Sequence, residues 1–389
     1  MKKKKLPLRH KLVWGFFTPP VRLLMWLKFG YRARRAKNLP DKYIVLSNHL
    51  TDYDPILVGL SFPQMYFVGS EHIARWGFVS KFLKWGFDPI LRYKGMPATS
   101  AIMNILRKIK LGGNVAMFAE GVRSWDGMPS PIAPTTGQLI KNSGVALVTY
   151  KITGGYFISP MWSGKNTRRG KSFGEVVDVY TKEELAEMSV EDINRAIKRD
   201  LWEDAYETQQ KEMNSYKGKR LAEGFENLLF ICPSCKKIET IRSEDCTAYC
   251  TNCNFKLTYT ELGMLKGAPF NTCKELAAWQ KEELNTLAQN SAVFSAEDAE
   301  LVSVKDHEEE LVDKGTLTLS RDFISVGNTE VSLDAITEFS MHGKHSLVFS
   351  GRGFYYEINT TKSTNTLRFL LLYNSYAAMR TEKETSGVV

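Results

Sequence analysis

The sequence predicts three kinds of structure in succession: an α/β domain, a short cysteine-rich element and a β-rich C-terminal domain. From Tyr43 to about Lys182, short β-type runs alternate with helical patterns, which is typical of a sheet flanked by helices. Four cysteines then form two C-x-x-C pairs within residues 228–258. From about Leu311, short alternating strands are separated by Gly, Asn and Asp and end in one amphipathic helix.

Composition and charge narrow the class of protein. The 389 residues are 43% hydrophobic and 24% charged, which is typical of a folded chain of two or three domains. The net charge is +9, but residues 1–42 hold thirteen Lys or Arg and one acid, so the remainder carries −3. A broad basic face is therefore not expected, and neither is a nucleic-acid partner. The local excess favours contact with a membrane surface that contains anionic lipids.

Residues 1–42 are predicted to form a basic, amphipathic anchor at a membrane interface. Their apolar segments, Leu12–Phe17 and Val21–Phe29, are separated by Thr18-Pro19-Pro20. Neither segment approaches the ~20 apolar residues that a bilayer span requires, and no small-residue cleavage site marks a signal peptide. Two short interfacial segments rich in aromatic residues and cations are the preferred interpretation, with localisation at the cytoplasmic face of a membrane. A core helix whose aromatic side chains pack on the domain is the alternative.

The elements expected after the anchor follow the apolar periodicity. Strands of the α/β domain (43–182) are expected at Tyr43–Ser47, Met65–Gly69, Val115–Phe118, Val145–Ile152 and Phe173–Val179. Helices are expected at Ile56–Leu60, Phe78–Trp85 and Ser100–Leu111. Beyond this domain, the sequence predicts a helical extension of one or two long helices at 183–227, the cysteine element at 228–258, a helical linker at 259–310 with a helix at 271–290, and the β-rich domain at 311–389.

The segment Ser47-Asn48-His49-Leu50-Thr51-Asp52-Tyr53-Asp54-Pro55 carries the strongest chemical signal. His49 and Asp54 are spaced as H-x-x-x-x-D directly after a strand-like run. Five residues on an ideal helix turn through about 500°, so His49 must lie in the loop before a helix that begins near Asp54. An imidazole oriented by a carboxylate can take the proton of a hydroxyl nucleophile. The alternative is that Asp54 only caps the helix.

A second loop supplies groups that suit an anion. Phe118-Ala119-Glu120-Gly121-Val122-Arg123-Ser124 follows a strand-like run, and its glycine would allow backbone amides to approach a phosphate. Arg123 offers a planar fork of donors, and Arg92 places a second guanidinium near another strand end.

These blocks resemble the glycerolipid acyltransferases, the family of 1-acylglycerol-3-phosphate (lysophosphatidic acid) acyltransferases, over about residues 40–180. The first block is Asn48-His49 to Asp54, the second is Gly86 to Arg92, and the third is Phe118 to Ser124; a fourth aligns with Val145 to Gly154. Ala119 and Val122 replace the family's Pro and Thr in the third block. The fourth block has Thr149-Tyr150 where a Pro is typical, and these departures concern the region that shapes the acceptor and acyl pockets.

The resemblance implies an O-acyltransferase of phospholipid biosynthesis that needs no catalytic metal. His49 would be the general base and Asp54 its orienting group, while Arg92, Glu120, Gly121, Arg123 and Ser124 would bind the acceptor. The donor would be acyl-CoA or acyl carrier protein, the acceptor lysophosphatidic acid and the product phosphatidic acid. The chain has no Cys before Cys232, which excludes a Cys nucleophile in this domain. The alternatives are a remodelling acyltransferase or transacylase on another lysophospholipid, or a membrane adaptor without activity.

The cysteine element predicts a structural metal site. Cys232, Cys235, Cys250 and Cys253 form C-x2-C-x14-C-x2-C, close to the zinc-ribbon spacing, and four thiolates would close a tetrahedral zinc site. Cysteines that serve as metal ligands, and not as disulfides, indicate a reducing compartment. A redox pair and a ribbon without metal are the alternatives; Cys246 could replace one ligand, and Cys273 is expected to be a buried thiol. The C-terminal strands and helix resemble a pleckstrin-homology or GRAM-type module. This module and the ribbon are possible sites for a protein partner.

Overall fold

The computed structural model describes residues 6–92, 98–305, 308–351 and 353–386. Lys2–Lys5 of the predicted anchor therefore lie outside the described residues. The chain divides into two compact units, each of which is described by itself. Unit 1 consists of Met1–Arg92, Ala98–Glu223 and Tyr259–Leu265, and unit 2 of Tyr93–Pro97, Gly224–Thr258 and Lys266–Val389.

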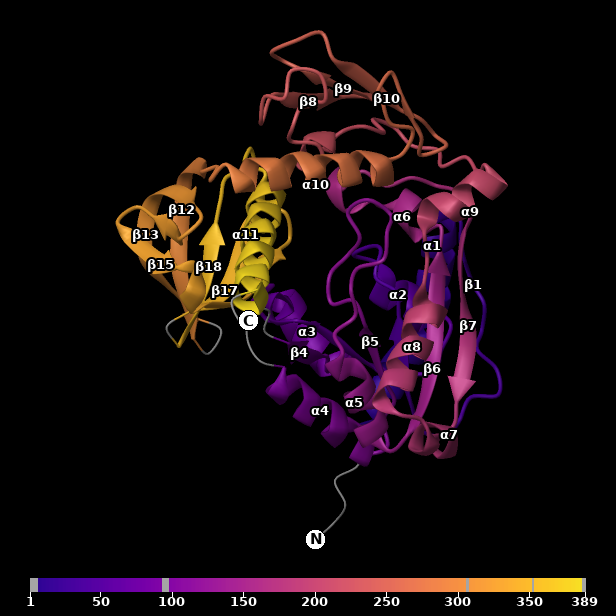
Figure 1. The fold of residues 1–389 in the computed structure, drawn as a ribbon. Helices are drawn as coiled ribbons and strands as arrows, with labels where there is room; N and C mark the ends of the chain where they lie inside the picture. The colour runs from indigo at the N-terminus through magenta and orange to yellow at the C-terminus, as the bar shows by residue number, and fades with distance from the viewer. Residues whose placement is uncertain (1–5, 93–97, 306–307, 352, 387–389) are drawn as a thin grey trace. The chain divides into compact units, whose positions relative to one another are not determined.

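Unit 1 is built on a seven-stranded sheet with helices around it (Figure 1). Its strands are β1 (Tyr31–Ala33), β2 (Tyr43–Ser47), β3 (Tyr66–Ser70), β4 (Ile90–Arg92), β5 (Val115–Phe118), β6 (Ala146–Thr153) and β7 (Ser172–Tyr180). Its helices are α1 (Leu8–Phe29), α2 (Asp54–Gly59), α3 (Phe78–Gly86), α4 (Thr99–Lys110), α5 (Thr135–Ser143), α6 (Gly155–Ile158), α7 (Lys182–Glu187), α8 (Val190–Leu201) and α9 (Ala205–Glu212). The predicted α/β class is confirmed.

The order of the strands brings the loop that contains His49 and the loop that contains Glu120 to one edge of the sheet. The order is β1-β7-β6-β2-β5-β3-β4, and β6, β2, β5, β3 and β4 run parallel to one another. Parallel strands share the edge at which their carboxyl ends lie, which is the usual position of a ligand site in such sheets. The loop after β2 begins at Asn48 and the loop after β5 at Ala119, so the two loops lie side by side.

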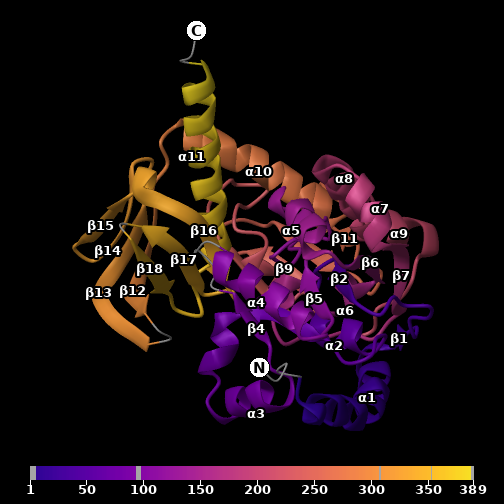
Figure 2. The same ribbon diagram turned by 90° about the horizontal axis from the view of Figure 1, so that it is seen from below.

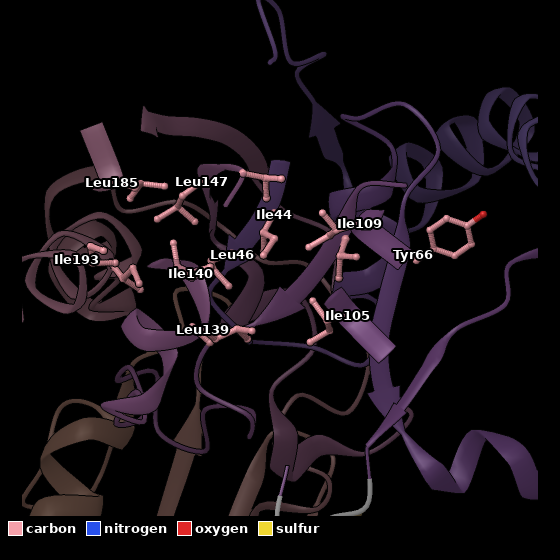
Figure 3. Close-up of a cluster of buried hydrophobic side chains, with 14 of the residues drawn as sticks. Ile44, Leu46, Tyr66, Ile105, Ile109, Leu139, Ile140, Leu147, Leu185 and Ile193 are labelled. Atoms are coloured by element: carbon pink, nitrogen blue, oxygen red, sulfur yellow. The ribbon is translucent and has the colours of Figure 1, made fainter. Parts of the chain in front are cut away.

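A cluster of buried aliphatic side chains fixes the sheet against its helices on one face (Figure 3). Ile44 and Leu46 project from β2 to this face, because alternate residues of a strand point the same way. They meet Ile105 of α4, Ile140 of α5 and Ile193 of α8. Burial of such side chains contributes roughly 1.5–3 kcal/mol each, so β2, which precedes the first loop, is firmly held.

The prediction of two short N-terminal segments was wrong, because α1 is a single helix that contains Pro19 and Pro20. Each proline removes one backbone donor, which leaves the carbonyls of Gly15 and Phe16 without their helical partners. Both residues are exposed, so solvent can satisfy these carbonyls. Helix α1 packs beside α3 through ring contacts such as Phe17–Phe82, with centroids 5.9 Å apart (Figure 2).

The extension after residue 182 contains three shorter helices, α7, α8 and α9, in place of the one or two long helices expected. Each has its own N-cap, at Thr181, Ser189 and Asp204, whose side chain accepts a backbone N–H of the first turn. Such caps begin new helices and stabilise each by about 1 kcal/mol. The continuous charged pattern concealed these starts, although Ser189 and Asp204 are ordinary capping residues.

In unit 2, the cysteine segment forms small antiparallel strands next to a long helix. The strands are β8 (Ile241–Glu244), β9 (Thr247–Cys250), β10 (Lys256–Tyr259) and β11 (Leu265–Lys266), paired in the order β11-β10-β9-β8, with β10 and β11 ending or starting in unit 1. The helix α10 (Cys273–Gln289) matches the helix expected at 271–290. Its buried Gln280 accepts from the backbone N–H of Phe230 and of Ile231, at 2.9 and 3.1 Å. This glutamine thus fastens the cysteine segment to α10.

The remainder of unit 2 is a seven-stranded antiparallel sheet with one helix, which confirms the predicted β-rich C-terminal domain. Its strands are β12 (Phe294–Lys305), β13 (Glu308–Leu319), β14 (Phe323–Val326), β15 (Thr329–Ser332), β16 (Ile336–His342), β17 (Ser346–Gly351) and β18 (Phe354–Asn359), in the order β15-β14-β13-β12-β18-β17-β16, and the helix is α11 (Thr366–Ser386).

The helical linker expected at 259–310 was wrong in its second half, because β12 occupies Phe294–Lys305. In the structure, its apolar residues Ala299, Leu301 and Val302 are buried while β12 pairs with both β13 and β18. Pairing on both sides, which is a tertiary effect, overrides the weak local preference.

Candidate active site

The loop after β2 places the imidazole of His49 against the carboxylate of Asp54. The distance from His49 Nδ1 to Asp54 Oδ2 is 2.8 Å. The Asp54 side chain is fully buried, whereas 19% of the His49 side chain is exposed. The structure therefore brings together the two residues of the H-x-x-x-x-D spacing, with the histidine as the accessible partner.

Asp54 is held by a set of local donors that all come from the same loop. Its Oδ2 also accepts from the backbone N–H of Leu50 at 2.6 Å and of Thr51 at 2.9 Å. Its Oδ1 accepts from the hydroxyl of Thr51 at 2.6 Å. Helix α2 begins at Asp54 with Tyr53 as N-cap, so the carboxylate points back into the loop and does not cap the helix. Donors of this kind hold a carboxylate in one orientation.

The hydrogen bond to Asp54 decides which nitrogen of His49 can act. Because Nδ1 faces a carboxylate, its proton lies there, and Nε2 then carries the lone pair. Nε2 has no hydrogen-bond partner among the residues that the structure describes. The ring stacks on Phe118 of β5, with centroids 4.4 Å apart and an angle of 18° between the planes. The stack and the carboxylate fix the direction in which Nε2 points.

The neighbouring Asn48 joins the first loop to the adjacent strand. Its side-chain amide donates to the carbonyl of Ile152 at 2.9 Å and accepts from the N–H of the same residue at 2.8 Å. Because the side-chain amide bonds both backbone groups of Ile152, it holds the start of the loop against β6. The family block includes this asparagine, but no pattern in the sequence indicated its partner.

Glu120, predicted as a residue that binds the acceptor, has backbone groups as partners in the structure. Its Oε1 accepts from the N–H of His49 at 3.1 Å, and its Oε2 accepts from the N–H of Ser130 at 2.6 Å. The residue is buried, and this burial raises the pKa of the carboxyl to about 7, although the two backbone donors oppose the rise. Glu120 is therefore a positioning residue that holds the His49 loop. Glu120 also lines a groove between residues 129–134 and α8. His49 is not among the residues that line this groove.

The raised pKa of Glu120 predicts an unusual pH dependence of stability. An acid whose pKa is higher in the folded state than in the unfolded state weakens the fold as the pH rises from about 4.5 to about 7. A shift of this size corresponds to roughly 3 kcal/mol. Glu120→Gln removes the titration, so the free energy of unfolding of the variant relative to the wild type should increase between pH 5 and pH 8.

This dependence can be measured by urea unfolding followed by tryptophan fluorescence, because seven of the eight tryptophans belong to unit 1. The lost acceptor for one backbone N–H adds an offset that does not vary with pH. Glu187→Gln, at an exposed position of α7, is the matched control and should show no comparable trend. A difference between Glu120→Gln and wild type that stays flat from pH 5 to pH 8 would contradict the assignment.

Gly121 and Ser124, two more of the predicted binding residues, shape the second loop. Gly121 has a φ of +69°, which favours glycine, and its N–H donates to the carbonyl of Phe118 at 3.2 Å. Ser124 is buried, and its N–H donates to the carbonyl of His49 at 3.1 Å. Its hydroxyl accepts from the N–H of Gly127 at 2.9 Å. Both residues therefore position the loop against His49, and the backbone N–H of each is already bonded within the protein.

Arg123 forms an ion pair that the sequence did not predict. Its guanidinium lies 2.8 Å from Oδ2 of Asp52, a residue of the first loop. Arg92 lies at the carboxyl end of β4, on the same edge of the sheet. Three strand spacings separate β4 from β2, or about 14 Å at the usual distance between strands. Of the two predicted arginines, Arg123 is thus the one that the structure places beside His49.

In unit 2, the four cysteines of the two pairs converge. The sulfur atoms of Cys232 and Cys253 are 3.7 Å apart, and those of Cys235 and Cys250 are 3.8 Å apart. All four sulfurs lie within 4.8 Å of one another, and none is in a disulfide. Sulfurs bound to one zinc ion at 2.3 Å in a tetrahedron would be about 3.8 Å apart. The cluster can hold a metal ion of this kind. Cys246 lies outside it, and Cys273 is buried, as expected.

Comparison with known proteins gives two findings. A comparison with curated proteins finds no match to this chain. Among solved structures, the chain is similar to the crystal structure of the 1-acyl-sn-glycerophosphate (LPA) acyltransferase PlsC from Thermotoga maritima. The TM-score is 0.43 and the identity 19%, over 52% of this chain and 79% of that chain.

A family model adds a direct assignment. The model of the Acyltransferase family matches residues 31–160, the segment that contains β1 to β6 and both loops of the site. The match begins before the first block around His49 and ends after the fourth. Residues 31–160 therefore match an acyltransferase family domain, in agreement with the acyltransferase resemblance that the sequence blocks indicated.

Proposed function

We propose that this protein transfers a fatty acyl group from a thioester donor, acyl-CoA or acyl carrier protein, to the free hydroxyl of a lysophospholipid. Lysophosphatidic acid is the acceptor that the family resemblance implies, with phosphatidic acid as product. The observation that supports this most is the buried Asp54 carboxylate, 2.8 Å from Nδ1 of a histidine whose Nε2 is left available. A neutral imidazole in this state is suited to act as a general base.

The proposed reaction needs only groups of this site and its two substrates. Nε2 of His49 removes the proton of the acceptor hydroxyl, and Asp54 stabilises the imidazolium that forms. The acceptor oxygen bonds to the thioester carbonyl carbon and gives a tetrahedral oxyanion. The oxyanion collapses, the C–S bond breaks, and the imidazolium proton goes to the leaving thiolate. The products are an ester and a free thiol, and no covalent acyl-enzyme is formed.

The proposed activity can be tested by the release of thiol from palmitoyl-CoA. Release that depends on added lysophospholipid and is accompanied by a diacyl product supports acyl transfer. Formation of diacyl lipid from lysophospholipid alone, without a thioester, would instead identify a transacylase. If neither reaction occurs with acyl-CoA or acyl carrier protein donors, the domain is an adaptor without this activity.

We also propose that unit 1 binds the surface of a membrane that contains anionic lipids. Of the described helices, none is long and apolar enough to cross a bilayer. Helix α1 nevertheless exposes large apolar side chains: Leu8, Leu12, Phe16, Phe17, Leu23, Leu24, Trp26 and Leu27. Helix α3 and the residue pair before it add Trp76, Phe78, Val79 and Trp85. Aromatic and aliphatic side chains beside many cations are typical of an interfacial segment.

Replacement of exposed leucines of α1 should therefore weaken membrane binding. Leu12→Ser with Leu24→Ser removes apolar surface without disturbing the core, because both side chains are exposed. At about 25 cal/mol per Å², we expect a loss of roughly tenfold or more in affinity for vesicles of mixed anionic and zwitterionic lipid, measured by sedimentation. Leu311→Ser, which removes an equally exposed leucine from β13 in unit 2, is the matched control. Equal binding by both variants would contradict the proposal.

We further propose that the metal of the cysteine cluster is zinc in a structural role. Four thiolates leave no open position for water, which suits a closed site. The distances between the sulfurs support this choice. A cluster of this kind, together with the sheet of β12–β18, would provide a surface for a protein partner.

A further inference from the structure

The ion pair between Asp52 and Arg123 joins the two loops of the site. Asp52 follows His49 by three residues, and Arg123 follows Glu120 by three. The exposed fraction of the side chain is 68% for Asp52 and 15% for Arg123. An incoming headgroup therefore meets the carboxylate before the guanidinium. Among the described residues, Arg123 forms an ion pair with Asp52 and with no other carboxylate.

The charges around this pair disfavour a doubly negative headgroup. A phosphomonoester carries about −1.5 to −2 near neutral pH. Asp52 already balances Arg123, and the buried Asp54 adds a negative charge behind His49. On α1, Lys28 donates to the hydroxyl of Tyr53 at 2.8 Å. A phosphomonoester bound to Arg123 would lie next to the carboxylate of Asp52, and like charges at contact distance repel strongly in a partly buried site.

A zwitterionic headgroup fits the same pair without this repulsion. Its phosphodiester carries one negative charge, which suits the guanidinium of Arg123. Its ammonium carries one positive charge, which suits the exposed carboxylate of Asp52. Each member of the ion pair then exchanges its partner for a group of the same charge, so no charge is left unpaired.

We propose that Asp52 is a specificity-determining residue that selects lysophospholipids with a cationic amine in the headgroup. This inference rests on the proposed acyl transfer and names its class of acceptor. Specificity here is a difference of two free energies: Asp52 attracts the ammonium of the favoured acceptor and repels the phosphomonoester of the other. Ethanolamine is expected to be accepted better than choline, because its N–H groups can donate to the carboxylate.

Four acceptors that share one acyl chain, with palmitoyl-CoA as donor, test the proposal. Their headgroups are phosphoethanolamine, phosphocholine, phosphoglycerol and the free phosphomonoester. Phosphoglycerol is a phosphodiester without a cation, so its comparison with phosphoethanolamine isolates the ammonium. In the wild type, kcat/KM should be highest with the two acceptors whose headgroups carry a cation, phosphoethanolamine and phosphocholine. In Asp52→Asn, the ratio of phosphoethanolamine to phosphoglycerol should fall about tenfold, the loss expected for one charged contact.

The same variant should increase kcat/KM with the phosphomonoester, because Arg123 loses its competing carboxylate. Glu175→Gln, which breaks an ion pair with Arg34 on the surface of unit 1, is the matched control and should leave all four ratios unchanged. If wild-type enzyme transfers acyl groups and Asp52→Asn leaves the ratio of amine to glycerol acceptors unaltered, the selection by Asp52 is refuted while the acyl transfer stands. If the wild type transfers to none of the four, the proposed function itself fails.

Discussion

His49→Ala should lower the rate of acyl transfer by roughly 10²–10⁴-fold, the range in which general bases contribute. The variant removes the only imidazole that the structure places in this loop, together with the nitrogen that receives the hydroxyl proton. The measurement is kcat for thiol release at saturating acceptor, since the loss should appear in kcat more than in KM if the histidine acts on the transition state.

The fold should survive this substitution, because Asp54 keeps three of its four donors. The N–H groups of Leu50 and Thr51 and the hydroxyl of Thr51 still bind the carboxylate. The His49 side chain is also partly exposed, so its removal leaves little new cavity. The thermal midpoint should therefore change by only a few degrees. Added imidazole should restore part of the rate by entering the space between Asp54 and Phe118.

An inactive variant that has also unfolded would not decide the role of His49, and for that reason the rescue by imidazole is the sharper measurement. Imidazole can restore a missing base, but it cannot restore a missing scaffold. A folded His49→Ala protein that keeps near-wild-type turnover would refute the assignment of His49 as the base.

The geometry of His49 and Asp54 could be predicted because it is local. Only four residues separate His49 from Asp54. With a strand before this loop and Pro55 directly after Asp54, few arrangements of the two side chains remain. The roles of Glu120 and Ser124 could not be derived in this way. Their partners are backbone groups of His49, Ser130 and Gly127, and the contacts to His49 exist only once β2 and β5 pair.

The same distinction explains the other departures from the sequence-based expectations. The ion pair of Asp52 and Arg123 joins loops that are seventy residues apart, so no spacing pattern reveals it. The continuity of α1 through Pro19 and Pro20 depends on packing against α3 and on exposed carbonyls. Strand β12 forms in an acidic stretch because two neighbouring strands supply its partners. In each case, the structure depends on contacts between segments that are distant in the sequence, which a local pattern does not show.

Removal of the metal should have the largest effect on the stability of unit 2. Closed thiolate sites in small zinc domains contribute roughly 10–16 kcal/mol of apparent binding free energy, and such domains unfold without their metal. Here the Cys232 end of the cluster continues from Phe230 and Ile231, whose N–H groups bind Gln280 of α10. Loss of the metal should therefore release the cysteine segment and also loosen its attachment to this helix.

Purified protein should contain one zinc ion per chain, and a strong chelator should lower the thermal midpoint and open residues 232–253 to protease. Cys232→Ser should reproduce both effects. Cys246→Ser is the matched control, because this cysteine lies between the two pairs in sequence but outside the cluster. The distances between the sulfurs allow either a bound metal or a redox-active pair of thiols. The zinc content and the stability of Cys232→Ser distinguish these two states. A protein without zinc whose Cys232→Ser variant is as stable as wild type has no structural metal, whereas a stabilisation that needs no metal and is lost when a reductant is added would identify a redox pair.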